Sequence, residues 1–382
     1  MNENVPVPTE ILREKIRVYA NSQREQQRDC SRDSLRFGLG EIKERIQQLD
    51  NLSENDVLGI ARRIKRRKHA APEDMYRLSH AFLQDLDNIK AFNKMSGALQ
   101  ILIKELTGKN SECQINAAEC LCNFSLGDSQ VCEKIASLAG SYLVTYLHSS
   151  EIQLVRLCLW TMANILATSS KGARICLQMQ LIPELWKLYV DDDIAHSLMD
   201  YREDSAICLQ IIALNHTNLL NDVDYEFLLQ HANKKNPTSL PNEYHLQIIF
   251  HILFSQEELV LGFPENLIIY LINYSLNIIH NTAEIIDIKE SLRVLYPVRV
   301  LANLLACIPS SYVKLLQELS IIWKINITDL FNKLFHYNCA LLNQEILWFL
   351  KNFLIQEEKH TTFSTSILEK LEIKRDWFEK QC

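Results

Sequence analysis

Two short stretches place a tryptophan four residues before an asparagine in an otherwise apolar run. "LWTMANILA" holds Trp160 and Asn164, and "ILWFLKNFLI" holds Trp348 and Asn352. Residues four apart share one face of a helix. On that face an asparagine amide can hydrogen-bond the backbone of an extended peptide, and an indole can stack on a lysine stem. The alternative is structural: a tryptophan in the core, and an asparagine that caps a helix or joins two repeats.

Similar stretches recur along the chain, and their spacing indicates the elements that position them. Asn123 and Asn164 are 41 residues apart, and Asn303 and Asn352 are 49 apart. The 139 residues between Asn164 and Asn303 hold three units of about 46 residues, within the period of armadillo and HEAT repeats. Degenerate copies fall in "CLQIIALNHTN" and "LQIIFHILFS". This predicts an all-α, right-handed α-solenoid of about six armadillo-like repeats.

In such a solenoid the third helix of each repeat lines a concave groove. We therefore expect six side chains on that groove: Asn123, Trp160, Asn164, Asn303, Trp348 and Asn352. Two repeats depart from the tryptophan pattern, because Glu119 stands four residues before Asn123 and Arg299 four before Asn303. We expect Arg299 to repel a cationic peptide.

The repeats carry a family resemblance. "QLIPELWKLY" and "INAAECLCNFS" follow the opening and closing patterns of armadillo repeats, and "WTMAN" and "WFLKN" resemble the third helices of importin-α. Over Ile11–Tyr189 the chain is similar to the family named transmembrane and coiled-coil domain-containing protein six. The resemblance implies an adaptor of the cytoplasm and nucleus that holds a basic cargo peptide for import into the nucleus. It also implies an amino-terminal arm that binds importin-β. The rival hypothesis is a scaffold or assembly factor with one dedicated partner.

A dense basic cluster precedes the first expected repeat. "RRIKRRK" supplies six cations: Arg62, Arg63, Lys65, Arg66, Arg67 and Lys68. Ser53 and Asp56 form the sequence pattern of a capping box that begins this helix, and cations favour its end. The alternatives are a localisation signal or a segment that occupies the protein's own groove. We predict a charged helical arm over residues 1–70, repeats over 71–374 and a tail over 375–382, with Ile367, Leu368 and Leu371 facing inward as a cap.

Composition excludes several classes of function. The chain of 382 residues has a net charge of −7, which argues against nucleic-acid binding, and no glycine follows Gly262, which favours helices over strands and phosphate loops. No phosphate-binding, dinucleotide or zinc-protease motif is present. We expect a monomer that is not an enzyme and has no metal, no cofactor and no transmembrane span. The 11 cysteines are expected to be reduced and buried on apolar helix faces.

Overall fold

The computed structural model describes residue 18 and residues 52–190, 201–233, 242–255, 257–282, 288–337 and 339–360. The chain divides into two compact units, Met1–Leu219 and Leu220–Cys382. Every regular element of the described residues is a helix. Apart from residue 18, Ile11–Arg28 of the expected arm lies outside the described residues, as do the expected cap residues and the tail.

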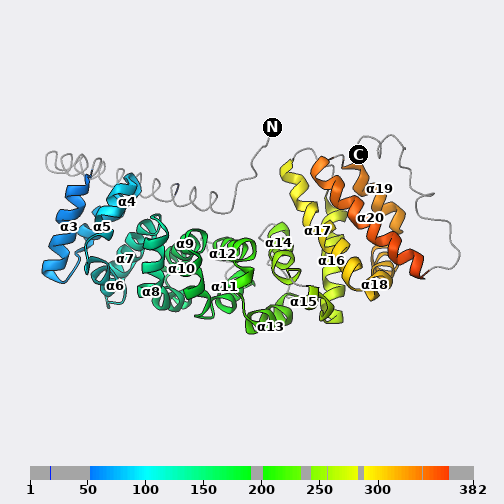
Figure 1. Cartoon of the computed structure of the whole chain (residues 1–382), viewed down its shortest axis with the longest axis horizontal. Coiled ribbons are helices and arrows are strands. Elements are labelled where there is room, and N and C mark those ends of the chain that lie inside the picture. Colours follow the sequence, from blue (N-terminus) through cyan, green and yellow to red (C-terminus); the bar gives the residue numbers. More distant parts are fainter. Residues whose placement is uncertain are drawn as a thin grey trace. The chain divides into compact units, whose positions relative to one another are not determined.

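Unit 1 is a stack of helices. The helices that correspond to the third helix of an armadillo repeat, here called third helices, pack one on the next. Its elements are α3 (Glu54–Arg67), α4 (Pro72–Gln84), α5 (Leu86–Asn93), α6 (Ala98–Leu106), α7 (Ser111–Phe124), α8 (Ser129–Thr145), η1 (Tyr146–His148), α9 (Ile152–Thr168), α10 (Ser170–Leu177), α11 (Leu181–Val190), α12 (Arg202–Asn215) and η3 (Thr217–Leu219). The third helices are α4, α7, α9 and α12, and each contacts its successor. Figure 1 shows α9 and α12 side by side.

Unit 2 repeats this arrangement. Its elements are α13 (Asp222–His231), α14 (Asn242–Leu253), α15 (Glu257–Leu261), α16 (Glu265–Asn281), α17 (Ile288–Cys307), α18 (Ser310–Glu318), the π-helical turn η4 (Leu319–Trp323), α19 (Ile327–His336) and α20 (Ala340–His360). The third helices are α14, α17 and α20; α17 packs between α14 and α20. Figure 1 shows α17 and α20 adjacent in this unit.

After α3 and α4 in the chain, the described helices group into six armadillo-like repeats. These repeats are α5–α7, α8–α9, α10–α12, α13–α14, α15–α17 and α18–α20. The predicted all-α fold of about six armadillo-like repeats is therefore confirmed, with each unit an α-solenoid. The degenerate copies in the sequence correspond to the third helices α12 and α14.

Local sequence determines where several of these helices begin. The side chains of Asn110, Asp128 and Ser169 accept hydrogen bonds from backbone N–H groups in the first turns of α7, α8 and α10, at 3.0–3.1 Å. Asn221 and Asn326 form capping boxes at the starts of α13 and α19. These caps satisfy backbone N–H groups that a helix leaves unpaired in its first turn. They therefore determine the residue at which each of these helices begins.

Apolar and cysteine side chains fill the interior between the helix layers. In unit 1 the rings of Phe82, Phe92 and Phe124 lie 5.2 Å apart, centroid to centroid. Seven of the described cysteines are buried free thiols. Burial raises the pKa of Cys122 and of Cys176 to about 12, so both remain protonated at neutral pH. The expectation of buried cysteines is confirmed for these seven.

The helix α3, which falls in the expected arm, packs on the helices that follow it. Its capping box at Ser53 and Asp56 is present as predicted. However, α3 packs against α4, α5 and α6, and Val57, Ile60 and Ile64 are buried. The apolar spacing of these residues gives the helix one inward stripe. Residues 54–67 therefore pack on the helical stack of unit 1, and the division expected at residue 70 stays a prediction.

Candidate peptide-binding face

The first two asparagines of the predicted groove join consecutive third helices of unit 1. Asn123 on α7 donates from Nδ2 to Ser79 Oγ on α4 at 2.7 Å, and Asn164 on α9 donates to Ser125 Oγ at 2.9 Å. Only 3% of Asn123 and 4% of Asn164 is exposed. Their amide donors are therefore used in bonds between repeats, which is the structural alternative left open by the sequence.

Trp160 is also buried, with 2% of the residue exposed. The expectation that it opens onto the groove is wrong. Arg156, one turn earlier on α9, places its guanidinium carbon 5.0 Å from the centroid of the indole ring. Its Nε lies 3.3 Å from Oδ2 of the buried Asp204 on α12. A cation of the chain itself thus occupies the ring face that a lysine of a bound peptide would need.

Glu119 takes the position of the tryptophan on α7. It is half-buried, and its Oε1 accepts a hydrogen bond from Ser79 Oγ at 3.2 Å. Burial raises the pKa of its carboxyl, and the bond from Ser79 opposes that shift. Ser79 thus links Glu119 to Asn123, and no indole wall exists in this repeat.

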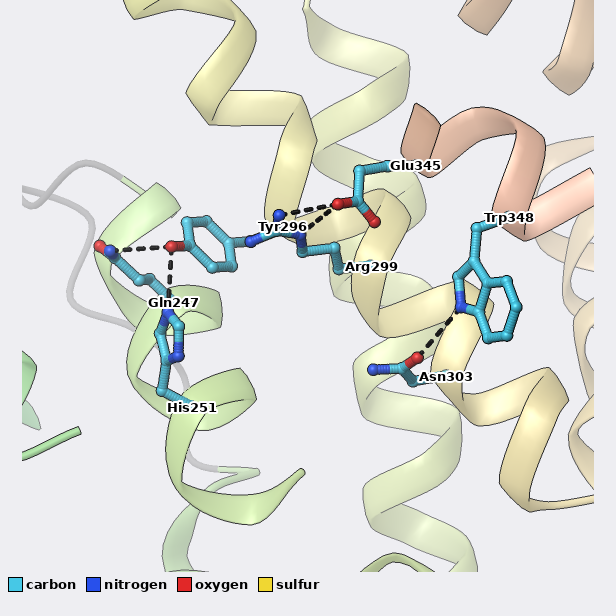
Figure 2. Close-up of polar contacts among 7 residues, drawn as sticks. All are labelled: Gln247, His251, Tyr296, Arg299, Asn303, Glu345 and Trp348. Carbon is cyan, nitrogen blue, oxygen red and sulfur yellow. Dashed lines mark hydrogen bonds and ion pairs between the residues drawn. The ribbon is translucent and has the colours of Figure 1, made fainter. Parts of the chain in front are cut away.

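In unit 2 the same pattern produces a more open surface. Asn352 on α20 is buried and donates to the carbonyl of Ala302 at 3.0 Å, which resembles the role of the asparagines in unit 1. Trp348, one turn earlier, is 40% exposed. Figure 2 shows its indole turned toward α17, where Nε1 donates to Oδ1 of the half-buried Asn303 at 3.3 Å. Within the described residues, Nδ2 of Asn303 donates no hydrogen bond.

Arg299 is neutralised by a partner that the sequence pattern did not reveal. Its Nε and Nη2 donate to Oε1 of Glu345 on α20 at 2.9 Å and 2.7 Å (Figure 2). Its guanidinium carbon also lies 5.6 Å from the centroid of the Tyr296 ring. The expected repulsion by an isolated Arg299 is therefore corrected, because a carboxylate of the next third helix offsets the charge.

Tyr296 connects α17 to α14. Gln247 Nε2 donates to its hydroxyl at 3.0 Å, and His251 Nε2 lies 3.1 Å from the same oxygen (Figure 2). Burial and the nearby Arg299 both lower the pKa of His251, while burial raises the pKa of Tyr296. A neutral His251 can then accept a hydrogen bond from the phenolic hydroxyl, which keeps its proton. Three third helices are tied together by this chain of contacts, which runs from α14 through α17 to α20.

We call this set of unit 2 residues the α17–α20 face. It comprises Gln247, His251, Tyr296, Arg299, Asn303, Glu345 and Trp348. The sequence predicted Asn303 and Trp348 but gave no signal for Glu345, Gln247 or Tyr296. The number of residues between each of these side chains and its partner differs from repeat to repeat, as it does for Ser79 and Ser125. No fixed spacing in the sequence therefore identifies them.

No group of three or more His, Cys, Asp or Glu side chains in the described ranges is placed to hold a metal ion. Among the described helices, none combines the length and the hydropathy needed to cross a bilayer. The α17–α20 face offers an indole, an amide donor and an ion pair, which suit the contacts made by an extended peptide.

No protein-family model matches the chain. Among solved structures, the crystal structure of an engineered protein is similar, with a TM-score of 0.59 and 17% sequence identity over 86% of this chain and 75% of that chain. Two designed armadillo repeat proteins match 82% of this chain and 100% of their own. One has a TM-score of 0.39 at 16% identity. The other, in complex with the peptide (KR)4, has a TM-score of 0.34 at 15% identity. The first match shows that the fold is shared with a solved structure.

Proposed function

We propose that this protein is a non-enzymatic binding adaptor that holds an extended segment of a partner protein on the α17–α20 face. The observation that carries the proposal is the exposure of Trp348 together with its fixed orientation. Its indole N–H is held by Asn303, so little side-chain freedom remains to be lost when a partner binds. Exposed, oriented tryptophans are the residues that anchor protein interfaces most often.

The neighbouring donor supplies the polar half of the site. Nδ2 of Asn303 donates no hydrogen bond within the described residues, and Oδ1 of the same amide accepts the indole N–H of Trp348. A backbone carbonyl of a bound peptide would satisfy this donor while an apolar side chain packs on the indole. A hydrogen bond from a side-chain amide and an apolar contact, repeated along the third helices, can hold an extended chain on the concave surface of a solenoid.

The finer assignment is an importin-α-like adaptor that carries basic signals for protein import into the nucleus. It is supported by the Trp-x-x-x-Asn pattern at Trp348 and Asn352 and by the resemblance of Ile11–Tyr189 to the family named above. Under this assignment the protein belongs to that family, works in the cytoplasm and nucleus, and binds importin-β through its amino-terminal arm.

A second candidate is a scaffold for one dedicated partner, and the internal cations favour it. Lys351 Nζ lies 5.3 Å from the centroid of the Trp348 ring, and Arg156 covers Trp160. The only carboxylate of the α17–α20 face, Glu345, is already bonded to Arg299. A lysine-rich peptide would have to displace Lys351 and would find no free carboxylate on this face. A partner segment with fewer cations avoids both costs.

Binding measurements with Trp348→Ala test the proposal. A labelled octapeptide of alternating lysine and arginine serves as the basic probe, and affinity purification from cells reports dedicated partners. Under the import assignment, Trp348→Ala weakens binding of the octapeptide by about 1–3 kcal/mol. Under the scaffold assignment the octapeptide does not bind, and a reproducible partner is lost from the variant.

The matched control is Tyr142→Ala. Tyr142 is a similarly exposed aromatic residue, at 43%, but it lies on α8, which is not a third helix. If both variants retain the octapeptide and every partner, the α17–α20 face does not bind a partner and the proposal is wrong. Loss of the same partners in both variants would contradict it equally, because exposed aromatic area anywhere would then explain the binding.

A further inference from the structure

The end of α3 and the neighbouring helix α6 form a second, strongly charged surface, independent of the α17–α20 face. We call it the basic surface and define it by six exposed cations: Arg62, Lys65, Arg66, Arg67, Lys68 and Lys104. Lys104 joins the cluster because its Nζ donates to the carbonyl of Lys68 at 3.2 Å. We propose that the basic surface binds an acidic segment of a partner protein.

The cations lie on a folded helix, not on an extended signal. Ile60, Ala61 and Ile64 are buried between the same cations that are exposed. Lys68 ends the helix in the left-handed conformation, with φ of 54°, and its N–H bonds to the carbonyls of Ile64 and Lys65. Extending the run into a groove would remove the fully buried Ile64 from the core and expose its side chain to water. The interpretations as a linear localisation signal or as a pseudo-cargo segment are therefore disfavoured.

Carboxylates of the described residues neutralise only part of the sequence cluster. Arg63 is bonded to Asp74, with Nε 3.1 Å from Oδ1, and this bond raises the pKa of the guanidinium. His69 Nδ1 lies 2.8 Å from Oε1 of Glu105. The six cations of the basic surface make no ion pair with any described residue. Arg63 therefore belongs to the packing of α3 on α4, whereas the other cations remain available to a partner.

The stability of the helix does not account for this arrangement. The helix dipole favours the cations of the last turn, Lys65, Arg66 and Arg67. It does not explain Arg62, one turn earlier, or Lys104 on another helix. Like charges at Arg62 and Arg66, four residues apart, repel each other. A partner that supplies carboxylates would remove this repulsion and would gain Coulomb attraction from several cations at once.

The surroundings of the cations favour an acidic protein segment over other polyanions. None of the exposed large apolar side chains of the described residues lies on α3 or α6. The surface therefore has no anchor for acyl chains and no aromatic platform for bases, which membrane-binding helices and single-strand-binding proteins use. Three of the six cations are arginines, whose planar guanidinium groups can bind carboxylates through two parallel hydrogen bonds.

The test measures binding of a fluorescent octaglutamate peptide to the full chain. Fluorescence polarisation gives the affinity at low and at physiological salt. The variant Lys65→Glu/Arg66→Glu/Lys104→Glu should weaken binding about tenfold or more, and the affinity of the unchanged protein should fall as salt rises. All three residues are exposed, so the fold should survive, as checked by circular dichroism. The matched control is Lys171→Glu/Arg174→Glu/Lys187→Glu, which makes the same charge change on α10 and α11 of unit 1.

Several outcomes would overturn the proposal. These are no binding of octaglutamate, an equal loss in both triple variants, or binding of oligouridylate or phosphatidylserine vesicles by a protein that ignores the peptide. Trp348→Ala should leave octaglutamate binding unchanged. A failure of the α17–α20 face and a failure of the basic surface would therefore be seen separately.

Discussion

The third-helix faces of unit 1 and unit 2 share the Trp-x-x-x-Asn pattern, in which the asparagine is buried in both units and the tryptophan is buried in unit 1 alone. In unit 1, Trp160, Asn123 and Asn164 are buried, and both asparagine amides bond to serine hydroxyls of the preceding repeat. In unit 2, Trp348 is exposed, and its indole bonds to a half-buried Asn303. One pattern therefore supports two roles, and the neighbouring helix decides between them.

The carboxylates that pair with the arginines of the two faces differ in burial as well. Arg156 in unit 1 reaches the indole of its own helix and a buried aspartate of the next third helix. Arg299 in unit 2 pairs with Glu345, and both side chains keep partial contact with solvent. Ion pairs in contact with solvent are screened and contribute less to stability. Unit 1 thus uses its aromatic and charged residues for packing, whereas unit 2 leaves an indole and an amide donor at the surface.

The largest expected effect contrasts the two tryptophans. Trp160→Ala should lower the free energy of unfolding by about 3–5 kcal/mol, because it empties a buried site. Trp348→Ala should change it by no more than about 0.5 kcal/mol, because an exposed ring leaves no cavity. Thermal unfolding followed by circular dichroism measures both variants. Equal changes in the free energy of unfolding would mean that Trp160 and Trp348 have the same structural role in the two units.

The asparagines give a smaller version of the same contrast. Asn164→Ala removes a buried hydrogen bond to the Ser125 hydroxyl, which keeps only its bond to the carbonyl of Cys122, so the expected loss is about 1–3 kcal/mol. Asn303→Ala removes only the acceptor of an exposed indole, and the expected change is about 0.5 kcal/mol or less. Chemical denaturation compares the variants. A larger loss of stability for Asn303→Ala than for Asn164→Ala would mean that the stabilising asparagine bonds lie in unit 2 rather than in unit 1.

The smallest expected effect concerns the pH dependence of unit 1. Burial raises the pKa of Glu119, so the folded chain holds this proton to a higher pH than the unfolded chain does. Stability is therefore lost as the pH rises from the ordinary glutamate pKa, about 4.3, through the raised value. Glu119→Gln should melt at a slightly higher temperature than the unchanged protein at neutral pH. That advantage should shrink as the pH falls through the raised pKa toward the ordinary one; an advantage that grows in acid would contradict the assignment.

Periodicity predicted the repeats because each one must bury the same helix faces. The spacing of Asn123, Asn164, Asn303 and Asn352 identified four third helices, and the capping residues Ser53 and Asp56 located the start of α3. These signals are local, with separations of three or four residues or one repeat. They are sufficient for the number and type of elements.

The candidate site was predicted less well. Trp348 and Asn303 lie at the surface expected from the pattern, whereas Trp160 does not. The partners that make the difference lie one repeat away in sequence and in no constant register. Ser79 is 44 residues from Asn123, Ser125 is 39 from Asn164, and Glu345 is 46 from Arg299. A varying separation of this kind leaves no motif to find.

The basic cluster shows the same division. Its six cations and its capping box are visible in the sequence, and the apolar residues Val57, Ile60 and Ile64 already favour a packed helix. Only the tertiary structure pairs Arg63 with Asp74, brings Lys104 to the end of α3 and leaves the remaining cations exposed.

The sequence by itself determined the helices, their repeat period and the residue types on each third helix, because these follow from spacing along one chain segment. The tertiary structure decided which tryptophan is buried, which asparagine donor is used and which arginine is neutralised. Each of those outcomes depends on a group supplied by a neighbouring helix. Hydrogen bonds and ion pairs act over a few ångströms in space and carry no fixed separation in sequence.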